Sequence, residues 1–417
     1  MTALNIALIH YAAPPIVGGV ESVLAQHARL MTQAGHRVTV LAGRGAPVAG
    51  GGELLLLPQV DSRHPDVLAL KAELDRGSVP AGFTTLRDEI LGALRPSLSL
   101  QDVVIAHNVC SLHKNLALTA ALYLLSQEPG APRFILWHHD LAWTAERYRG
   151  ELHPGYPWDL LRTDWPGTQP VVVSEARRQE LAALLGDPAG RIQVAPNGVS
   201  REQLLKLEDQ TTALLRQMAL GEAEPLLLLP ARLTPRKNIE LALKVLAKLR
   251  RELPNAALLV TGPEGPHNPV NAVYRQRLLA LRDELGLAGA AHFAAEHDTL
   301  PLPDVVVADF LRLADALILP SRDEGFGIPL VEAALARLPV FCADIPPLRE
   351  LGGTDVTYFA LEAEPAAIAH QIASRLQNDP VYRFAARARQ RYTWDRLYET
   401  SLAPLLAAAR LAGAGGL

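Results

Sequence analysis

Two glutamates eight positions apart, Glu324 and Glu332, enclose the segment with the clearest chemical content, and Gly325, Gly327 and Pro329 lie between them. Glycines permit backbone angles and close approaches that side chains would block, and proline suits the first turn of a helix. Carboxylates accept hydrogen bonds from sugar hydroxyls, while free N–H groups at a helix start attract anions. The segment therefore predicts a site for a ligand that carries hydroxyl groups and phosphate.

Each glutamate taken alone has a simpler explanation, because an acidic residue near a helix start often only stabilises the helix dipole. We favour a binding site because the carboxylates, glycines and proline occur together. The apolar run 316–320 predicts a buried strand before the segment, and residues 329–337 predict a helix after it. Glu332 should then lie in the first helical turn and Glu324 on the loop, both facing one crevice. Ser321 either lines this pocket or caps the turn.

A second candidate loop, residues 230–238, follows the predicted strand 226–229 and carries Arg232 and Lys237. When a diphosphate leaves a sugar, negative charge grows on the departing oxygen, and each preorganised cation there can lower the barrier by about 3–4 kcal/mol. Arginine offers a bidentate fork and lysine a compact charge. An isolated pair of this spacing is more typical of a solvated basic loop. Arg236 is a further cation that we do not expect to contact the ligand.

The first half of the chain also places polar residues after predicted strands. Gly18 and Gly19 follow the first strand, where a glycine loop can approach a phosphate, although any tight turn can carry such a pair. His138, His139 and Asp140 follow another strand without the further ligand that a zinc site needs, and a hydrogen-bonded structural histidine is the simpler alternative.

Ser174 follows a later predicted strand, and we expect it first to be a helix N-cap and only secondarily a ligand contact. Trp143, Tyr148, Tyr156 and Trp158 could stack on a ligand or equally pack locally. The sequence leaves both pairs of alternatives open.

Strands that alternate with helices position these residues in both halves of the chain, which predicts parallel sheets covered by helices on both faces. The predicted strands are 5–10, 37–42, 54–57, 103–106, 134–137 and 171–173, and then 226–229, 257–261, 290–293, 316–320 and 340–343. The predicted helices are 20–34, 86–94 and 116–126, and then 239–252, 274–285, 309–313 and 329–337. Residues 61–84 have no assignment.

The length, net charge and cysteine content of the chain limit which classes of protein it can belong to. A length of 417 residues suggests two domains, and the turn at 195–198 predicts the joint between them. The net charge of −4 gives no reason to expect a nucleic-acid partner, and no apolar run approaches the roughly 18 residues of a transmembrane helix. Only Cys110 and Cys342 are present, without a CxxC pair, so a reducing, cytoplasmic location is expected.

The spacings Arg232-x4-Lys237 and Glu324-x7-Glu332 resemble the signature of the family 4 glycosyltransferases, retaining enzymes that use nucleotide-sugar donors. The resemblance covers nearly the whole chain and is densest between residues 232 and 350. It implies an α/β GT-B fold, with two Rossmann-like doubly wound parallel-sheet domains facing a central cleft. Residues 1–198 would form the acceptor domain and 199–389 the donor domain, and a final helix near 390–410 would pack back on the first domain.

The same resemblance implies transfer of a hexosyl unit from a nucleotide sugar, such as a UDP- or GDP-hexose, to an acceptor hydroxyl, without a metal or another cofactor. Arg232 and Lys237 would hold the diphosphate, Glu332 the ribose and Glu324 the transferred sugar, while His139 would lie near the departing oxygen. The implied catalytic residues are His139, Glu324, Arg232 and Lys237. The implied donor-binding residues are Gly18, Gly19, Gly262, Gly325, Phe326, Gly327 and Glu332, and contacts by His138, Asp140, Ser174 and Ser321 stay open.

Other functions remain open at this point. A nucleotide-sugar epimerase or a phosphorylase would share the GT-B architecture, and a non-catalytic sugar-nucleotide-binding protein would be expected to have lost Glu324, Arg232 or Lys237. The acceptor can be a sugar, a polyol or a lipid-linked molecule. Peripheral membrane contact occurs in the family, but no strongly basic amphipathic helix supports it here. Lys237→Ala is expected to reduce transfer by orders of magnitude while leaving the fold intact.

Overall fold

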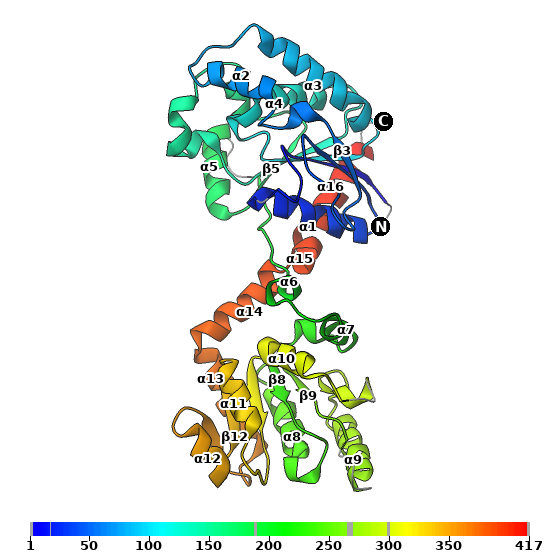
Figure 1. The fold of residues 1–417 in the computed structure, drawn as a ribbon, viewed down its shortest axis with the longest axis vertical. Helices are drawn as coiled ribbons and strands as arrows, with labels where there is room; N and C mark the ends of the chain where they lie inside the picture. The colour runs from blue at the N-terminus through cyan, green and yellow to red at the C-terminus, as the bar shows by residue number, and fades with distance from the viewer. Residues whose placement is uncertain (1–2, 17, 187–189, 265–269, 298–300, 415–417) are drawn as a thin grey trace. The chain divides into compact units, whose positions relative to one another are not determined.

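The computed structural model describes residues 3–16, 18–186, 190–264, 270–297 and 301–414. The chain divides into two compact units, one made of Met1–Val199 with Tyr392–Leu417 and the other of Ser200–Arg391. Each unit is built around one sheet whose paired strands are all parallel (Figure 1). The predicted α/β class with two doubly wound parallel sheets is therefore confirmed.

The first unit has a seven-stranded sheet in the order β3-β2-β1-β4-β5-β6-β7. Its strands are β1 (Asn5–Ile9), β2 (Arg37–Ala42), β3 (Glu53–Leu56), β4 (Val103–His107), β5 (Arg133–His138), β6 (Gln169–Val172) and β7 (Gln193–Val194). The strand order reverses between β1 and β4. In open sheets of this kind, ligands bind beyond the carboxyl ends of the strands at such a switch point.

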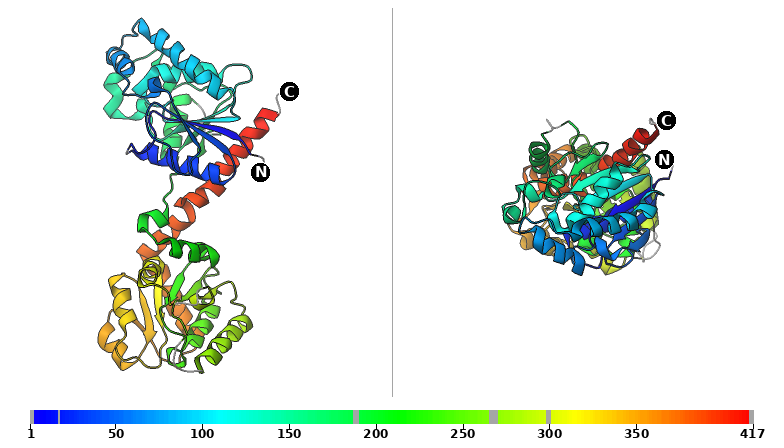
Figure 2. Two further views of the ribbon diagram at one scale, coloured as in Figure 1. Left: turned by 45° about the vertical axis from the view of Figure 1, so that its right-hand side comes forward. Right: turned by 90° about the horizontal axis from the view of Figure 1, so that it is seen from above.

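Helices cover both faces of this sheet. They are α1 (Gly19–Gln33), α2 (Pro65–Leu74), α3 (Gly82–Leu98), α4 (Leu116–Ser126), α5 (Glu175–Leu185), α15 (Trp394–Leu397) and α16 (Ala403–Ala414). Helices α3 and α4 contribute Ile90, Leu94 and Leu118 to one apolar core. On the other face, Trp394 and Leu405 from the end of the chain share a core with Leu8 of β1. Figure 2 shows this last segment, in red, alongside the blue strands of the same unit.

The second unit has a six-stranded sheet in the order β10-β9-β8-β11-β12-β13. Its strands are β8 (Leu226–Leu229), β9 (Ala257–Val260), β10 (Ala291–Phe293), β11 (Ala316–Leu319), β12 (Val340–Ala343) and β13 (Thr357–Phe359). Its helices are α6 (Arg201–Leu205), α7 (Asp209–Gln217), α8 (Ile239–Leu249), α9 (Val270–Glu284), α10 (Asp304–Leu313), α11 (Ile328–Leu335), α12 (Pro346–Gly352), α13 (Pro365–Asn378) and α14 (Pro380–Tyr392). The switch point lies between β8 and β11.

Among the described residues, every helix falls short of the length and apolar character needed to span a bilayer.

Candidate functional site

Two loops meet at the switch point of the second sheet. One loop, residues 230–238, leaves β8, and the other, residues 320–327, leaves the neighbouring strand β11. The N–H of Arg322 donates to the carbonyl of Arg236 at 2.8 Å, and the Arg322 guanidinium donates to Oδ1 of Asn238 at 3.1 Å. These bonds tie the loops together, so the two candidate motifs found in the sequence lie side by side.

Lys237 and Glu324 form a buried ion pair between these loops. Nζ of Lys237 lies 2.6 Å from Oε1 of Glu324, and the two side chains are only 10% and 6% exposed. Arg236 is a weaker partner, because its guanidinium is 53% exposed and lies 3.8 Å from Glu324. Sequence reasoning assigned the lysine to phosphate and the glutamate to sugar but did not predict that they would contact each other.

Arg232 is exposed on the same loop, and within the described part of the chain it makes no ion pair. Gly262, which follows β9, lies directly against this loop. A Cβ atom built on Gly262 would lie 2.1 Å from the carbonyl oxygen of Ala231. Glycine at position 262 therefore lets the backbone of residues 231 and 232 pack closely against it. This packing is a structural reason for a glycine at position 262.

The loop 320–327 carries two glycines with different requirements. Gly327 has φ +102°, and a Cβ there would lie 2.6 Å from Cδ2 of Leu348, so both backbone angle and packing demand glycine. Gly325 has no such neighbour within 4 Å of a built Cβ. Open space at Gly325 leaves room for a ligand to approach the backbone. Phe326 between them is 58% exposed, and Ser321 at the start of the loop is buried.

The prediction that Glu332 lies in the first turn of its helix is wrong. Helix α11 begins at Ile328 with Gly327 as its N-cap, one residue earlier than predicted, so Glu332 falls in the second turn. Its side chain is exposed. Because Gly327 has no side chain, no side-chain cap covers the N-terminus of α11.

Histidines occupy the switch point of the first sheet. His10 directly follows β1, and its Nδ1 donates to the carbonyl of His107, the last residue of β4, at 2.7 Å. Nδ1 of His107 and Nε2 of His139 are 3.3 Å apart and share a hydrogen bond. His139, and not His138, thus joins the residues around the switch point. Sequence reasoning missed His10 and His107, although both stand where a predicted strand ends.

Burial keeps these imidazoles neutral. Burial, reinforced by the proximity of His139, lowers the pKa of His27 to about 3 and that of His138 to about 3. The pKa of His139 is lowered to about 4, mainly by burial and then by His10, against an opposing effect of Asp140. Burial also holds the pKa of His107 well below its usual value. The site can therefore donate and accept hydrogen bonds without carrying charge.

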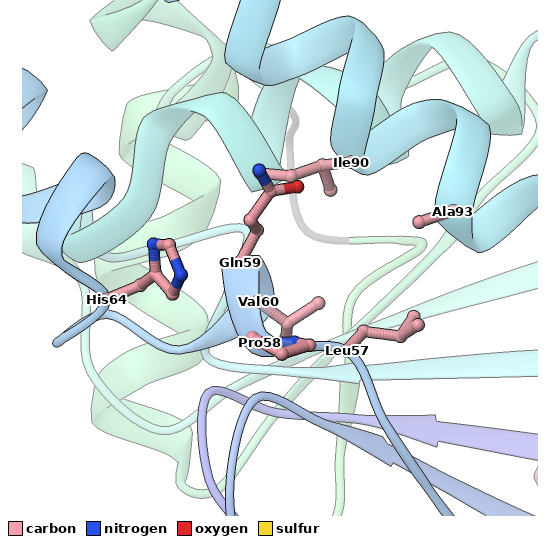
Figure 3. A pocket seen from close by; sticks show the side chains of 7 residues that line it. All are labelled: Leu57, Pro58, Gln59, Val60, His64, Ile90 and Ala93. Atoms are coloured by element: carbon pink, nitrogen blue, oxygen red, sulfur yellow. The ribbon is translucent and has the colours of Figure 1, made fainter.

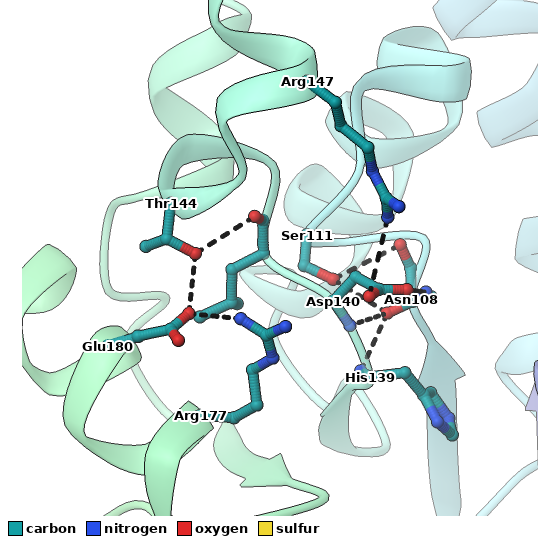
Figure 4. A network of polar contacts seen from close by, with 9 residues as sticks. Asn108, Ser111, His139, Asp140, Thr144, Arg147, Arg177 and Glu180 are labelled. Atoms are coloured by element: carbon teal, nitrogen blue, oxygen red, sulfur yellow. Dashed lines mark hydrogen bonds and ion pairs between the residues drawn. The ribbon is translucent and has the colours of Figure 1, made fainter.

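Asn108, which follows β4, holds the segment that carries His139 (Figure 4). Its side-chain oxygen Oδ1 accepts the N–H of His139 at 2.8 Å and the N–H of Asp140 at 3.0 Å. Arg147 lies 3.8 Å from the Asp140 carboxylate. The structure thus brings His139 and Asp140 together on one fixed segment, and Asn108 is a further residue that sequence reasoning missed.

The remaining candidate residues of the first unit lie at helix starts or in the connection after β5. Helix α1 starts at Gly19, where a built Cβ would meet nothing within 4 Å, and Gly18 before it is extended with φ −169°. Ser174 is confirmed as an N-cap, because its side chain accepts the N–H of Arg177. Trp143 packs locally, with its ring under the Arg162 guanidinium and its N–H donating to the carbonyl of Trp158.

Two other features of the first unit lie outside this site. A cavity of about 300 Å³ lies beside the end of β3 and is lined mostly by apolar side chains (Figure 3): Leu57, Pro58, Gln59, Val60, His64, Ile90 and Ala93.

A cluster of Asp75, His113 and Glu151 has side chains close enough to hold a metal ion. However, Nζ of Lys71 already lies 2.6 Å from Asp75 and 2.9 Å from Glu151, and its charge balances these carboxylates.

Comparison with known proteins agrees with these features. The family model described as Glycosyltransferase Family 4 matches residues 17–203, and that described as Glycosyl transferases group 1 matches residues 211–392. Together these matches cover most of the chain. The protein belongs to the family 4 glycosyltransferases, which have the GT-B fold. It is a retaining hexosyltransferase that transfers a sugar from a nucleotide sugar.

Two of the relatives align with the chain over most of their own length. The chain is 23% identical to mannosylglucosylglycerate synthase of Petrotoga mobilis over 82% of this chain and 83% of the relative. It is 26% identical to a glycogen synthase of Mycobacterium tuberculosis over 95% of this chain and 92% of the relative. A solved glycosyltransferase from Rickettsia africae covers 99% of both chains at 15% identity, with a TM-score of 0.38.

Proposed function

We propose that the second unit binds the donor, a UDP- or GDP-hexose, at the loops 230–238 and 320–327, and that the first unit binds the acceptor. The observation that carries this assignment is the buried pair of Lys237 and Glu324 at the switch point, beside the exposed Arg232. Among the described residues Arg232 has no carboxylate partner, and such a cation on the same loop as the paired Lys237 suits a diphosphate, which carries more than one negative charge. A hexose as the transferred sugar is supported by the names of the relatives, a mannosylglucosylglycerate synthase and a glycogen synthase.

Within this proposal, Arg232 and Lys237 hold the diphosphate, and Glu332 accepts hydrogen bonds from the ribose hydroxyls. The backbone of residues 325–327 faces the sugar and phosphates, where the open space at Gly325 permits a close approach. Gly262 lies near the base, as the neighbour of the Arg232 loop. In the first unit, Gly18 and Gly19 at the start of α1 face the diphosphate; the space beside Gly19 leaves room for it, and the Glu21 carboxylate lies against Gly18.

Transfer breaks the bond between the anomeric carbon and the phosphate oxygen and forms a bond from that carbon to the acceptor oxygen on the same face. The acceptor proton moves to the leaving phosphate, whose growing charge Arg232 and Lys237 stabilise. Glu324 is held by Lys237 and therefore orients the sugar instead of acting as a nucleophile. His139 is neutral and contributes a hydrogen bond near the departing oxygen, with Asp140 beside it.

The acceptor in this proposal is a hydroxyl of a sugar, a polyol or a lipid-linked molecule, bound near the carboxyl ends of β1, β4 and β5. We further propose a cytoplasmic location, which is supported by the free thiols of Cys110 and Cys342.

The donor is identified by thermal unfolding of the protein with a panel of UDP-, GDP- and ADP-hexoses. A ligand at about 100 times its Kd stabilises the state that binds it by about 2.7 kcal/mol, so one nucleotide sugar should raise the melting temperature clearly. Far-UV circular dichroism is the suitable signal, because all five tryptophans lie in the first unit and report on that unit alone. Arg232→Ala should abolish the shift. A panel with no stabilising nucleotide sugar would contradict the donor assignment.

A further inference from the structure

Asn108 occupies an unusual backbone position at the end of a central strand. It directly follows β4, is 2% exposed and has φ +59°, in the left-handed region that few residues other than glycine adopt. Asparagine tolerates this region better than most residues. Its own N–H donates to the carbonyl of Trp137 in β5 at 2.8 Å, which anchors the turn to the neighbouring strand.

The side chain of Asn108 crosses from β4 to the segment that leaves β5. Oδ1 accepts two successive backbone N–H groups, those of His139 at 2.8 Å and Asp140 at 3.0 Å. Nδ2 donates to Oδ2 of Asp140 at 3.4 Å, and the Ser111 hydroxyl lies 3.3 Å from Oδ1 (Figure 4). One amide therefore fixes both peptide groups that determine where His139 and Asp140 point.

The ring of His139 is held independently. Its Nε2 shares a hydrogen bond with Nδ1 of His107, the residue immediately before Asn108. Two consecutive residues of one strand end thus fix His139, one at its backbone and the other at its ring. Such support leaves His139 little freedom of position or orientation.

We propose that Asn108 is a positioning residue for sugar transfer: its side-chain oxygen holds the His139–Asp140 segment so that the His139 ring meets the substrate in a productive geometry. This inference rests on the proposed role of His139. Misplacement of a reacting group by about 1 Å can reduce a rate about 100-fold. Loss of the Asn108 side chain should therefore lower kcat more than it lowers the affinity for the donor.

Asn108→Gly tests the inference, because glycine adopts φ +59° without strain and removes only the side chain. Asn115→Gly is the matched control. Asn115 is also 2% exposed and lies in the same connection, but its Oδ1 accepts the N–H of Leu118 at 3.1 Å and its Nδ2 donates to the carbonyl of Gln59 at 2.9 Å. Both variants lose a buried amide, and only Asn108→Gly releases His139.

Asn108→Gly should lower kcat by about 10- to 100-fold with little change in KM for the donor, and hydrogen exchange should accelerate at the amides of His139 and Asp140. Asn115→Gly should keep kcat and instead accelerate exchange at Leu118. Asn108→Asp retains an oxygen acceptor for both N–H groups but replaces the Nδ2 donor by an oxygen 3.4 Å from the Asp140 carboxylate, so it should slow exchange and restore kcat only in part.

Unchanged exchange at residues 139 and 140 in Asn108→Gly, or a loss of kcat no larger than in Asn115→Gly, would overturn the inference. His139→Ala separates this result from the proposed function. If His139→Ala transfers at the wild-type rate, the role of His139 fails, and with it the role of Asn108 in transfer. If His139→Ala is impaired and Asn108→Gly is not, only the inference about Asn108 fails.

Discussion

Replacement of Lys237 by methionine should damage stability and transfer together, and the two effects can be separated. The ammonium and the carboxylate of Glu324 are 2.6 Å apart and largely removed from water. Opposite charges about 4 Å apart attract by about 4 kcal/mol at an effective dielectric constant of about 20. Removal of one partner of a buried pair typically destabilises a protein by about 3–5 kcal/mol, because the other charge is left without compensation.

Lys237→Met should therefore destabilise the second unit by about 3 kcal/mol, since the exposed Arg236 at 3.8 Å replaces the lost partner only weakly. The expectation from the sequence that Lys237→Ala leaves the fold intact is revised accordingly. Transfer should fall by about 10²–10³-fold if Lys237 supplies about 3–4 kcal/mol of stabilisation to the leaving diphosphate.

The double variant Lys237→Met with Glu324→Gln distinguishes the two effects. Glutamine has the shape of glutamate without its charge, so the double variant should recover most of the lost stability. It should not recover transfer, because the proposed cation for the diphosphate and the carboxylate proposed to orient the sugar are then both missing. Recovery of wild-type transfer in the double variant would refute the proposed roles of both Lys237 and Glu324 in transfer and leave them only as partners of each other.

The assay is urea unfolding followed by far-UV circular dichroism, with initial transfer rates measured on the same samples. Tryptophan fluorescence serves as an internal control, because it reports on the first unit and should not change. Arg236→Met is the matched control, since an exposed ion pair contributes at most about 1 kcal/mol. Wild-type stability of Lys237→Met would contradict the reasoning from burial.

Further predictions concern the glycines, the second glutamate and pH. Gly327→Ala should destabilise the second unit by about 1–3 kcal/mol in urea unfolding because its φ is +102°, whereas Gly325→Ala should unfold as the wild type does and weaken donor binding in calorimetry. Glu332→Gln removes an exposed carboxylate, so stability should stay unchanged while the donor Kd rises about tenfold, the equivalent of one hydrogen bond. The pKa values of His27 and His138 are lowered from 6.5 to about 3, so their contribution to stability is present above pH 6.5 and is lost as pH falls toward 3. Below pH 6.5, each histidine should lower the free energy of unfolding by about 1.4 kcal/mol for each pH unit. Urea unfolding at pH 7 and pH 5, followed by tryptophan fluorescence, measures this decrease.

Local patterns in the sequence were sufficient to predict much of the fold. Helix α4, strand β8 and strand β12 have the predicted bounds, because each is a short apolar run with a clear turn signal on either side. Residues 61–84 resisted assignment because α2 there lacks a regular apolar face; only Val67 and Leu74 of this helix are buried. Helices α12 to α14 and strand β13 were not predicted.

The candidate motifs could also be predicted, but their pairing could not. Lys237 and Glu324 are 87 positions apart, and only the crossover between β8 and β11 brings their loops together. No local spacing encodes that contact. Asn108 is different, because it lies two positions after the predicted buried strand 103–106, where polar residues were visible in the sequence. The rule that ligands bind at carboxyl strand ends would have selected it together with His107.

The two switch points differ in electrostatics, and this difference supports the proposed division of roles. The second unit places a buried ion pair and the exposed Arg232 beside its loops, which suits a charged diphosphate. The first unit places neutral imidazoles there, because burial lowers the pKa of His139 to about 4 and that of His107 well below its usual value. Neutral imidazoles bind hydroxyl and phosphate oxygens only through hydrogen bonds, so they add no cation for a diphosphate. A site of that kind fits an uncharged acceptor hydroxyl better than a nucleotide.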